Sequence, residues 1–335
     1  KKKINPFLTL SFYESPQLQK TSAEIFVTKE YDIQNNQNYK FHKQTKKKIR
    51  IAYYSADFRN HPMSYLLANL YELHDKNKFE IIGISFGPDK DDKMRRRVSE
   101  AFDEFYDVRL KTDDEIVKFS RELKIDIAID LMCFTKYHKF GIFVKRCAPI
   151  QVNYLGYPGT SGANYLDYII ADKIIIPKES QKYYSEKIVY LPDTYQANDS
   201  TKKISDKVFT RQELGLPKDG FVFCCFNNNY KITPQVFDVW MRLLERVENS
   251  VLWILSENIN ISKNLKKEAT IRGIDFNRIV FAERIKMNEH LARQKVADLF
   301  IDTFPYTGHT TVSDALWVGL PVLTRIGKSF ASRVS

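Results

Sequence analysis

A glycine, a histidine and two threonines stand in a row between an apolar strand-like run and an apolar helical pattern, as Gly308, His309, Thr310 and Thr311. The first backbone N–H groups of a helix have no partners within it, so they form a ready site for an anion. Asp314 lies one turn further on the same helix face, where it could accept hydrogen bonds from ribose hydroxyls. The alternative is that one threonine only caps the helix. The row of four favours an anion site.

Two further loops place a titratable side chain directly after an apolar run. Lys231 follows the run 221–226 and could reach a pyrophosphate as a point charge, although a single lysine is usually a solvated surface group. His61 follows the run 49–55 and could exchange a proton near neutral pH. Its structural alternative is an idle side chain beside a helix that is capped by Asn60.

The segment 153–172 holds three glycines and a proline between apolar stretches. Glycine lets a backbone come close to a ligand and present its N–H groups. Ordinary turns would use the same residues, so this segment alone leaves a ligand loop and a plain turn equally open.

Apolar strands alternate with amphipathic helices along most of the chain, which predicts an α/β fold with parallel sheets covered on both faces. The predicted strands are 49–55, 79–86, 125–131, 221–226, 250–255, 278–282, 298–304 and 321–325. Ligands of such sheets bind outside the carboxyl ends of the strands. The loops that contain His61, Lys231 and Gly308 all leave such ends.

The length of 335 residues predicts two domains of ordinary size. Residues 1–48 are polar, with one helix expected around 15–26 and a linker-like stretch at 35–48, so we interpret them as an N-terminal appendage. The alternation starts at 49 and restarts after a connecting region, which predicts two Rossmann-like halves, 49–204 and 205–335.

Hydrophobic residues make up 43% of the chain and charged residues 28%, as in ordinary folded proteins. No apolar run reaches the roughly 20 residues of a membrane span, and the start lacks the apolar stretch of a signal peptide. The four cysteines lack the spacing of a zinc site and are typical of buried thiols. We therefore expect a cytoplasmic protein without a membrane span.

The formal net charge of +11 suggests a nucleic-acid partner at first sight. Positive charge is dense only in 1–3, 46–50 and 93–97, however, and is elsewhere interleaved with acidic residues, which favours a solvated surface and no nucleic-acid partner. The dinucleotide fingerprint, the P-loop and the G-x-S-x-G nucleophile elbow are all missing. Hydride transfer, P-loop phosphoryl transfer and esterase chemistry are thereby disfavoured.

Several long strings resemble the catalytic region of glycosyltransferase family 41, the O-GlcNAc transferase and SPINDLY family, in its bacterial form. They are SADFRNHP, APIQVNYLGYPGTSG, YSEKIVYLPDTYQ, FCCFNNNYKITP, GHTTVSDALWVGLPVLT and SFASRVS, in order from about Ile49 to Ser335. The resemblance implies a GT-B fold with a nucleotide-sugar cleft between the two halves. It also implies inverting transfer of one sugar to a protein side chain, with UDP-GlcNAc the commonest donor.

The resemblance assigns roles to residues at matching positions. His61 resembles the active-site histidine, Lys231 the lysine on the donor diphosphate, and Gly156 and Pro158 the loop beside the donor sugar. The remaining matches concern the nucleotide: His290 on the base, Arg293 after it, His309, Thr310 and Thr311 on the diphosphate, and Asp314 near the ribose.

Asn228 and Met287 depart from the animal relatives, which carry a glutamine and a nucleotide-contacting lysine there. GDP-fucose and UDP-glucose therefore remain possible donors beside UDP-GlcNAc. The tetratricopeptide array of the family is not in this sequence, and the family continues past Ser335, so a truncated second half is one expectation.

No metal or other cofactor is expected, because the protein's own cations can stabilise the leaving diphosphate and no acidic pair is evident. An acceptor protein or peptide is the expected partner beside the nucleotide sugar. Two rival interpretations stay open: a sugar-nucleotide epimerase of GT-B shape and a non-catalytic fragment that only binds the donor. The general base and the choice between oxygen and nitrogen linkage also stay open.

Overall fold

The computed structural model describes residues 4–31, 41, 47–88, 90–256 and 258–335. It divides into two compact units, residues 1–201 and 202–335, called the first and second unit below. The division comes three residues before the predicted boundary at 204/205. It also places the described residues of the segment 1–48, which the sequence sets apart as an appendage, in the first unit.

The first unit contains a seven-stranded sheet in the order β3-β2-β1-β4-β5-β6-β7, in which every neighbouring pair is parallel. Its strands are β1 (Ile49–Ser55), β2 (Phe79–Ser85), β3 (Glu104–Asp107), β4 (Ile127–Asp130), β5 (Ile150–Asn153), β6 (Tyr168–Ala171) and β7 (Lys187–Tyr190). The strands predicted at 49–55, 79–86 and 125–131 are confirmed as β1, β2 and β4. The other four strands, each of four residues, were not predicted.

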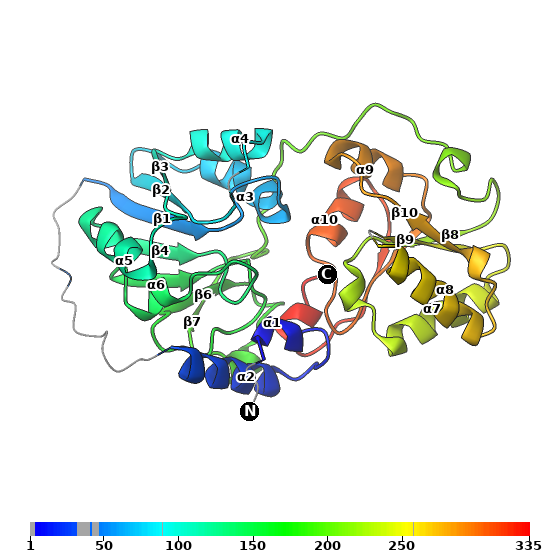
Figure 1. Ribbon diagram of the computed structural model, residues 1–335, viewed down its shortest axis with the longest axis horizontal. Coiled ribbons are helices and arrows are strands. Elements are labelled where there is room, and N and C mark those ends of the chain that lie inside the picture. Colours follow the sequence, from blue (N-terminus) through cyan, green and yellow to red (C-terminus); the bar gives the residue numbers. More distant parts are fainter. Residues whose placement is uncertain (1–3, 32–40, 42–46, 89, 257) are drawn as a thin grey trace. The chain divides into compact units, whose positions relative to one another are not determined.

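Helices connect these strands and cover the sheet (Figure 1). They are α3 (Pro62–Glu72), α4 (Lys93–Ala101), α5 (Asp113–Glu122), α6 (Gly141–Val144) and the 3-10 helix η1 (Lys178–Tyr183). The strand order runs outward from β1 through β2 to β3 and then resumes at β4 on the other side of β1. The reversal makes the carboxyl ends of β1 and β4 the crevice where open α/β sheets bind ligands.

The N-terminal helices α1 (Pro6–Thr9) and α2 (Pro16–Glu30) pack on the first unit, and α2 confirms the helix predicted around 15–26. Ala23 is fully buried. Gly162 lies so close to α2 that a Cβ atom on it would stand 2.6 Å from the backbone nitrogen of Glu24. The helical part of the predicted appendage is therefore part of this unit's core, while the predicted linker 35–48 lies almost wholly outside the described residues.

The second unit contains a five-stranded parallel sheet in the order β10-β9-β8-β11-β12. Its strands are β8 (Val222–Cys225), β9 (Val251–Leu255), β10 (Ile279–Ala282), β11 (Leu299–Ile301) and β12 (Val322–Leu323). These five confirm the strands predicted in this half. The strand order reverses between β8 and β11, so their carboxyl ends form the corresponding crevice.

Figure 1 shows α7 and α8 on one side of this sheet and α9 and α10 on the other. The helices of the unit are α7 (Pro234–Arg246), α8 (Ile259–Ile271), α9 (Met287–Gln294), α10 (Thr310–Trp317) and the 3-10 helices η2 (Gln212–Leu214), η3 (Asn229–Lys231), η4 (Phe276–Arg278) and η5 (Phe330–Ser332). Among the helices of the described ranges, none combines the length and apolar character that a membrane crossing needs.

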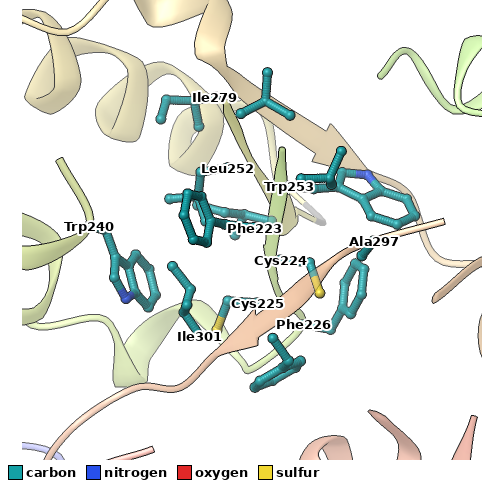
Figure 2. Close-up of a cluster of buried hydrophobic side chains, with 14 of the residues drawn as sticks. Phe223, Cys224, Cys225, Phe226, Trp240, Leu252, Trp253, Ile279, Ala297 and Ile301 are labelled. Carbon is teal, nitrogen blue, oxygen red and sulfur yellow. The ribbon is translucent and has the colours of Figure 1, made fainter. Parts of the chain in front are cut away.

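The core of the second unit surrounds β8 (Figure 2). Trp253 on the neighbouring strand is fully buried, and Trp240 of α7 is 2% exposed. Cys224 and Cys225 are adjacent on β8 and their side chains point apart (Figure 2). All four cysteines of the chain are buried free thiols, as the sequence predicts.

Candidate functional site

Two loops of the second unit leave the sheet at the crevice between β8 and β11. One runs from β8 through η3 to α7, and the other runs from β11 to α10. Both strands end in apolar residues that are buried in the core. The buried strand ends hold the two loops side by side, because β8 and β11 are paired.

Lys231 ends η3 and is 8% exposed. Its ammonium donates to the backbone oxygen of Thr307 at 2.8 Å and lies 3.7 Å from the ring centre of Tyr306. Burial lowers the pKa of Lys231 to about 8, against the opposing effect of the Asp302 carboxylate. The ammonium is thus charged at neutral pH, but its neighbours do not fully offset the cost of burying that charge. A bound anion would offset it further.

Asp302 directly follows β11 and organises the loop that leads to α10. Its Oδ1 atom accepts from the Asn227 side chain at 2.8 Å, from the Thr303 N–H at 2.8 Å and from the Gly308 N–H at 2.7 Å. Its Oδ2 atom accepts from the Thr324 hydroxyl at 2.7 Å. Sequence reasoning missed this residue because the run 298–304 was interpreted as one strand.

The start of α10 carries the predicted row of glycine, histidine and threonines. His309 is the N-cap residue, but its side chain makes no capping hydrogen bond, and the Thr311 hydroxyl donates instead to Asn227 Oδ1. The interpretation of a threonine as a mere cap is therefore wrong for this helix. A Cβ atom on Gly308 would come within 2.9 Å of Asn227 Oδ1, so only glycine fits there without a shift.

The His309 ring lies against Tyr306, with ring centres 5.1 Å apart. Its Nε2 atom is buried without a hydrogen-bond partner among the described residues. Burial, and then the nearby Lys231 charge, hold the pKa of His309 well below its usual value. The structure thus brings Lys231 and the 308–311 row together around one buried, electropositive point.

Asp314 is 3% exposed, and its carboxylate accepts from the Lys202 ammonium at 2.7 Å. Burial raises the pKa of Asp314, and Lys202 opposes that rise. The carboxylate expected to face a ribose thus already has a charged partner. Lys202 was not among the predicted residues, because it precedes Asp314 by 112 positions and no local pattern marks it.

His290 and Arg293 meet on one face of α9. The Arg293 Nε–H donates to His290 Nδ1 at 3.0 Å, and the His290 ring lies edge-on to Phe226 with ring centres 5.0 Å apart. Burial lowers the pKa of His290 to about 3, with the neighbouring arginines adding to the effect. His290 is therefore neutral at pH 7. It can stack on a ligand ring or form a hydrogen bond, but it cannot act as a cation.

Asn228 and Met287 mark the starts of two elements in the same unit. Asn228 is exposed and caps η3 by accepting from the Tyr230 N–H at 3.5 Å. Met287 is the first residue of α9. The structure gives neither side chain a contact that identifies a ligand.

His61 lies at the crevice of the first unit, between β1 and α3. It is the N-cap of α3, where its Nδ1 atom accepts from the Met63 N–H at 3.3 Å and lies 3.4 Å from Asp57 Oδ2. Burial raises the pKa of Asp57 to about 6, although Arg59 opposes the rise. The structural alternative, in which Asn60 caps the helix, is therefore wrong: His61 itself caps it.

Gly156 and Pro158 follow β5 in the same unit. A Cβ atom on Gly156 would stand 1.8 Å from the backbone oxygen of Leu131, which directly follows β4. Close backbone packing alone thus requires this glycine. Pro158 is buried in the same loop.

No group of three or more histidine, cysteine, aspartate or glutamate side chains is placed to hold a metal ion within the ranges that the structure describes.

The predicted residues form two sets, each on its own unit. His61, Gly156 and Pro158 lie on the first unit, and the residues predicted to bind the nucleotide lie on the second.

Comparison with known proteins gives a family and several relatives. The model of glycosyl transferase family 41 matches residues 17–208 and 196–335. The chain is 36% identical over 294 residues to a probable UDP-N-acetylglucosamine–peptide N-acetylglucosaminyltransferase, SEC, of Arabidopsis thaliana, covering 86% of the chain and 30% of the relative. A UDP-N-acetylglucosamine–peptide N-acetylglucosaminyltransferase of Caenorhabditis elegans is 26% identical, with 88% and 35% covered. The chain thus spans about a third of the length of these relatives.

Solved structures match as well. A mutant O-GlcNAc transferase of Thermobaculum terrenum superposes with a TM-score of 0.85 at 28% identity, over 98% of this chain and 62% of that one. Anabaena HepE, solved with UDP and glucose, has a TM-score of 0.56 at 14% identity, covering 84% and 82%, and shows the fold alone. With two parallel sheets in two units, the expected GT-B fold is confirmed.

Proposed function

The chain belongs to glycosyl transferase family 41, and on that premise we propose that it transfers a single sugar from a nucleotide donor to a peptide side chain. The observation that carries the proposal is the buried cation at the crevice of the second unit. Lys231 stands there beside Thr307 and the N-terminus of α10, and no ion pair is among the described contacts of its ammonium. A diphosphate can pair with this ammonium and accept hydrogen bonds from the N–H groups at the start of the helix.

The reaction breaks the bond between the anomeric carbon and the diphosphate oxygen, and forms a bond from that carbon to the acceptor atom. The nucleoside diphosphate leaves with the bonding electrons, so negative charge grows on it in the transition state. Lys231 and the N–H groups at the start of α10 stabilise that charge more strongly than the charge of the bound donor. The acceptor attacks the opposite face, which inverts the anomeric centre.

In this proposal His61 orients the acceptor or takes its proton. Its Nδ1 atom faces both the Met63 N–H and the Asp57 carboxylate, but it can either accept from Met63 or donate a proton to Asp57, not both. In the tautomer that caps α3 the proton is on Nε2, and the ring can only orient the acceptor. In the tautomer whose Nδ1–H donates to Asp57, the cap is given up, Nε2 holds a lone pair and the ring can act as the base.

UDP-GlcNAc is the proposed donor, because relatives at 36% and 26% identity carry that donor in their names. UDP-glucose and GDP-fucose are the alternatives to test. We place the activity in a reducing, cytoplasmic compartment, which the four buried free thiols support.

We propose that transfer needs no metal or other cofactor, since the cations of the protein can take the leaving charge. Turnover should be unchanged in EDTA. Loss of turnover in EDTA and its return with magnesium or manganese would contradict this part of the proposal.

The function is tested by incubating the protein with UDP-GlcNAc, UDP-glucose or GDP-fucose, each with and without a library of serine-, threonine- and asparagine-containing peptides. Nucleoside diphosphate release that requires peptide, with one sugar added to the peptide mass, supports the transferase. Conversion of the sugar without peptide would favour an epimerase. Binding without any turnover would favour a donor-binding fragment.

A further inference from the structure

One acidic side chain lies beside the proposed anion site. Asp302 is 9% exposed and accepts four hydrogen bonds, from Asn227, Thr303, Gly308 and Thr324. A carboxylate next to a diphosphate repels it, so an acidic residue at this place weakens binding unless another effect offsets the repulsion. The contacts of Asp302 indicate two such effects, one on the loop before α10 and one on the charge of Lys231.

The first contact set fixes the loop between β11 and α10. The Gly308 N–H donates to Asp302 at 2.7 Å, immediately before the helix start. The Asn227 amide donates to the same oxygen at 2.8 Å and to the Thr303 hydroxyl at 2.8 Å. Because the carbonyl oxygen of that amide accepts from Thr311, Asp302 also sets the direction of the Thr311 hydroxyl.

The second effect is electrostatic and acts on Lys231. The described contacts of its ammonium are the Thr307 oxygen and the Tyr306 ring, and no ion pair to a carboxylate is among them. The other titratable groups facing it are the Cys225 thiol from β8 and the His309 ring from the start of α10. Burial leaves both of these groups neutral at pH 7, because it raises the pKa of Cys225 and lowers that of His309. The Asp302 carboxylate is therefore the charged partner that favours the protonated lysine.

We infer that Asp302 is the positioning residue of the diphosphate site: it holds the 303–308 loop and the Thr311 hydroxyl in place, and it keeps the Lys231 ammonium charged. The inference rests on the proposed function for the identity of the ligand. It assigns to Asp302 a role that its charge alone would argue against.

Asp302→Asn separates charge from shape. An asparagine Oδ1 can keep the three contacts that Oδ1 of Asp302 makes, and its amide can donate to the Thr324 hydroxyl, which rotates to accept. The matched control is Asp298→Asn, which removes one negative charge at the amino end of β11, whereas Asp302 follows the carboxyl end of the same strand. Asp298 likewise accepts from a backbone N–H, that of Val222, at 2.7 Å and from an Arg211 side chain at 2.8 Å.

Calorimetry with UDP and with GDP between pH 6.5 and 9 gives the first readout. In the wild type, affinity should fall as pH rises through about 8, where Lys231 loses its proton. In Asp302→Asn the fall should begin roughly one pH unit lower, so the affinity relative to wild type should drop by up to about tenfold between pH 6.5 and pH 9, whatever the loss of carboxylate repulsion adds at every pH. Asp298→Asn should follow the wild type. Equal weakening at every pH, an unmoved profile, or the same shift in the control would overturn the inference.

The titration of Lys231 in the free protein gives a second readout that needs no ligand. Carbon-13 lysine NMR, with the signal assigned by Lys231→Met, should show a midpoint near pH 8 in the wild type. The midpoint should move down by about one unit in Asp302→Asn. An unmoved midpoint overturns the charge-setting role. If the wild type binds neither UDP nor GDP, the proposed function fails instead, and the NMR midpoint still decides whether Asp302 sets the Lys231 charge.

Discussion

The ammonium of Lys202 lies 2.7 Å from a carboxylate oxygen of Asp314, and their side chains are only 6% and 4% exposed. Lys202 is the first residue of the second unit, and Asp314 lies in the middle of α10. The pair therefore fastens the beginning of the unit to the helix whose N-terminus forms the anion site.

Lys202→Met should destabilise the protein by about 3–5 kcal/mol, because it leaves a buried carboxylate without its cation. Removing Lys202 also removes the effect that opposes the raised pKa of Asp314. A raised carboxyl pKa favours the folded state at low pH, so this variant should recover stability relative to the wild type as the pH falls.

The double variant Lys202→Met, Asp314→Leu supplies the control, since replacing a whole buried pair by apolar groups is often neutral. Urea unfolding at pH 5, 6 and 7 measures all three free energies. A double variant as unstable as the single one would show that packing, and not the unpaired charge, causes the loss.

Lys231→Met should raise the free energy of unfolding at pH 7 by as much as about 3 kcal/mol while abolishing tight UDP binding. The folded-state pKa of about 8 lies below the usual lysine value, so the charged lysine opposes folding at pH 7. This stability gain should shrink as pH rises from 8 toward 10, where the unfolded lysine also loses its charge. Lys295→Met, at an exposed position in the same unit, is the control and should change neither property.

The sequence predicted the parts of this site that follow wholly apolar strands. Lys231 and the 308–311 row come after β8 and β11, which are short but consist only of apolar, mostly buried residues. Asp302 could not be identified in the same way, because its partners Asn227 and Thr324 lie 75 and 22 positions away in the sequence.

The missed strands of the first unit have a similar physical reason. β3 and β7 are four residues long and only partly buried, so their sequences EFYD and KIVY carry too little apolar signal. The packing of α2 was also hidden, because the buried positions of this helix are Gln19, Ala23 and Val27. A glutamine and an alanine do not form the apolar stripe by which a core-facing helix side is recognised in a sequence. What these elements pack against is decided by residues far along the chain, such as Gly162.

Thr310 and Thr311 should respond differently to replacement by valine. The Thr311 hydroxyl donates to Asn227 Oδ1, so Thr311→Val leaves a buried acceptor unpaired and should cost about 1–3 kcal/mol of stability. The described contacts include none for the Thr310 hydroxyl, so Thr310→Val should weaken UDP binding while the thermal transition stays in place. Thermal unfolding and calorimetry on both variants make the comparison. Unchanged UDP and GDP affinity in both would remove the start of α10 from the donor site.

His61→Asn tests whether the first unit serves the acceptor side of the reaction. Asparagine is among the best N-cap residues, so this variant keeps the cap of α3 that His61 provides and removes only the imidazole. If the ring takes the acceptor's proton, turnover should fall by roughly 10²–10⁴-fold. Nucleotide affinity and the thermal transition should stay close to wild type, because the cationic site lies on the other unit. His61→Ala, which also loses the cap, should show the same loss of turnover plus a lower thermal transition. A nucleotide affinity reduced in His61→Asn as severely as in Lys231→Met would refute this division of roles between the two units.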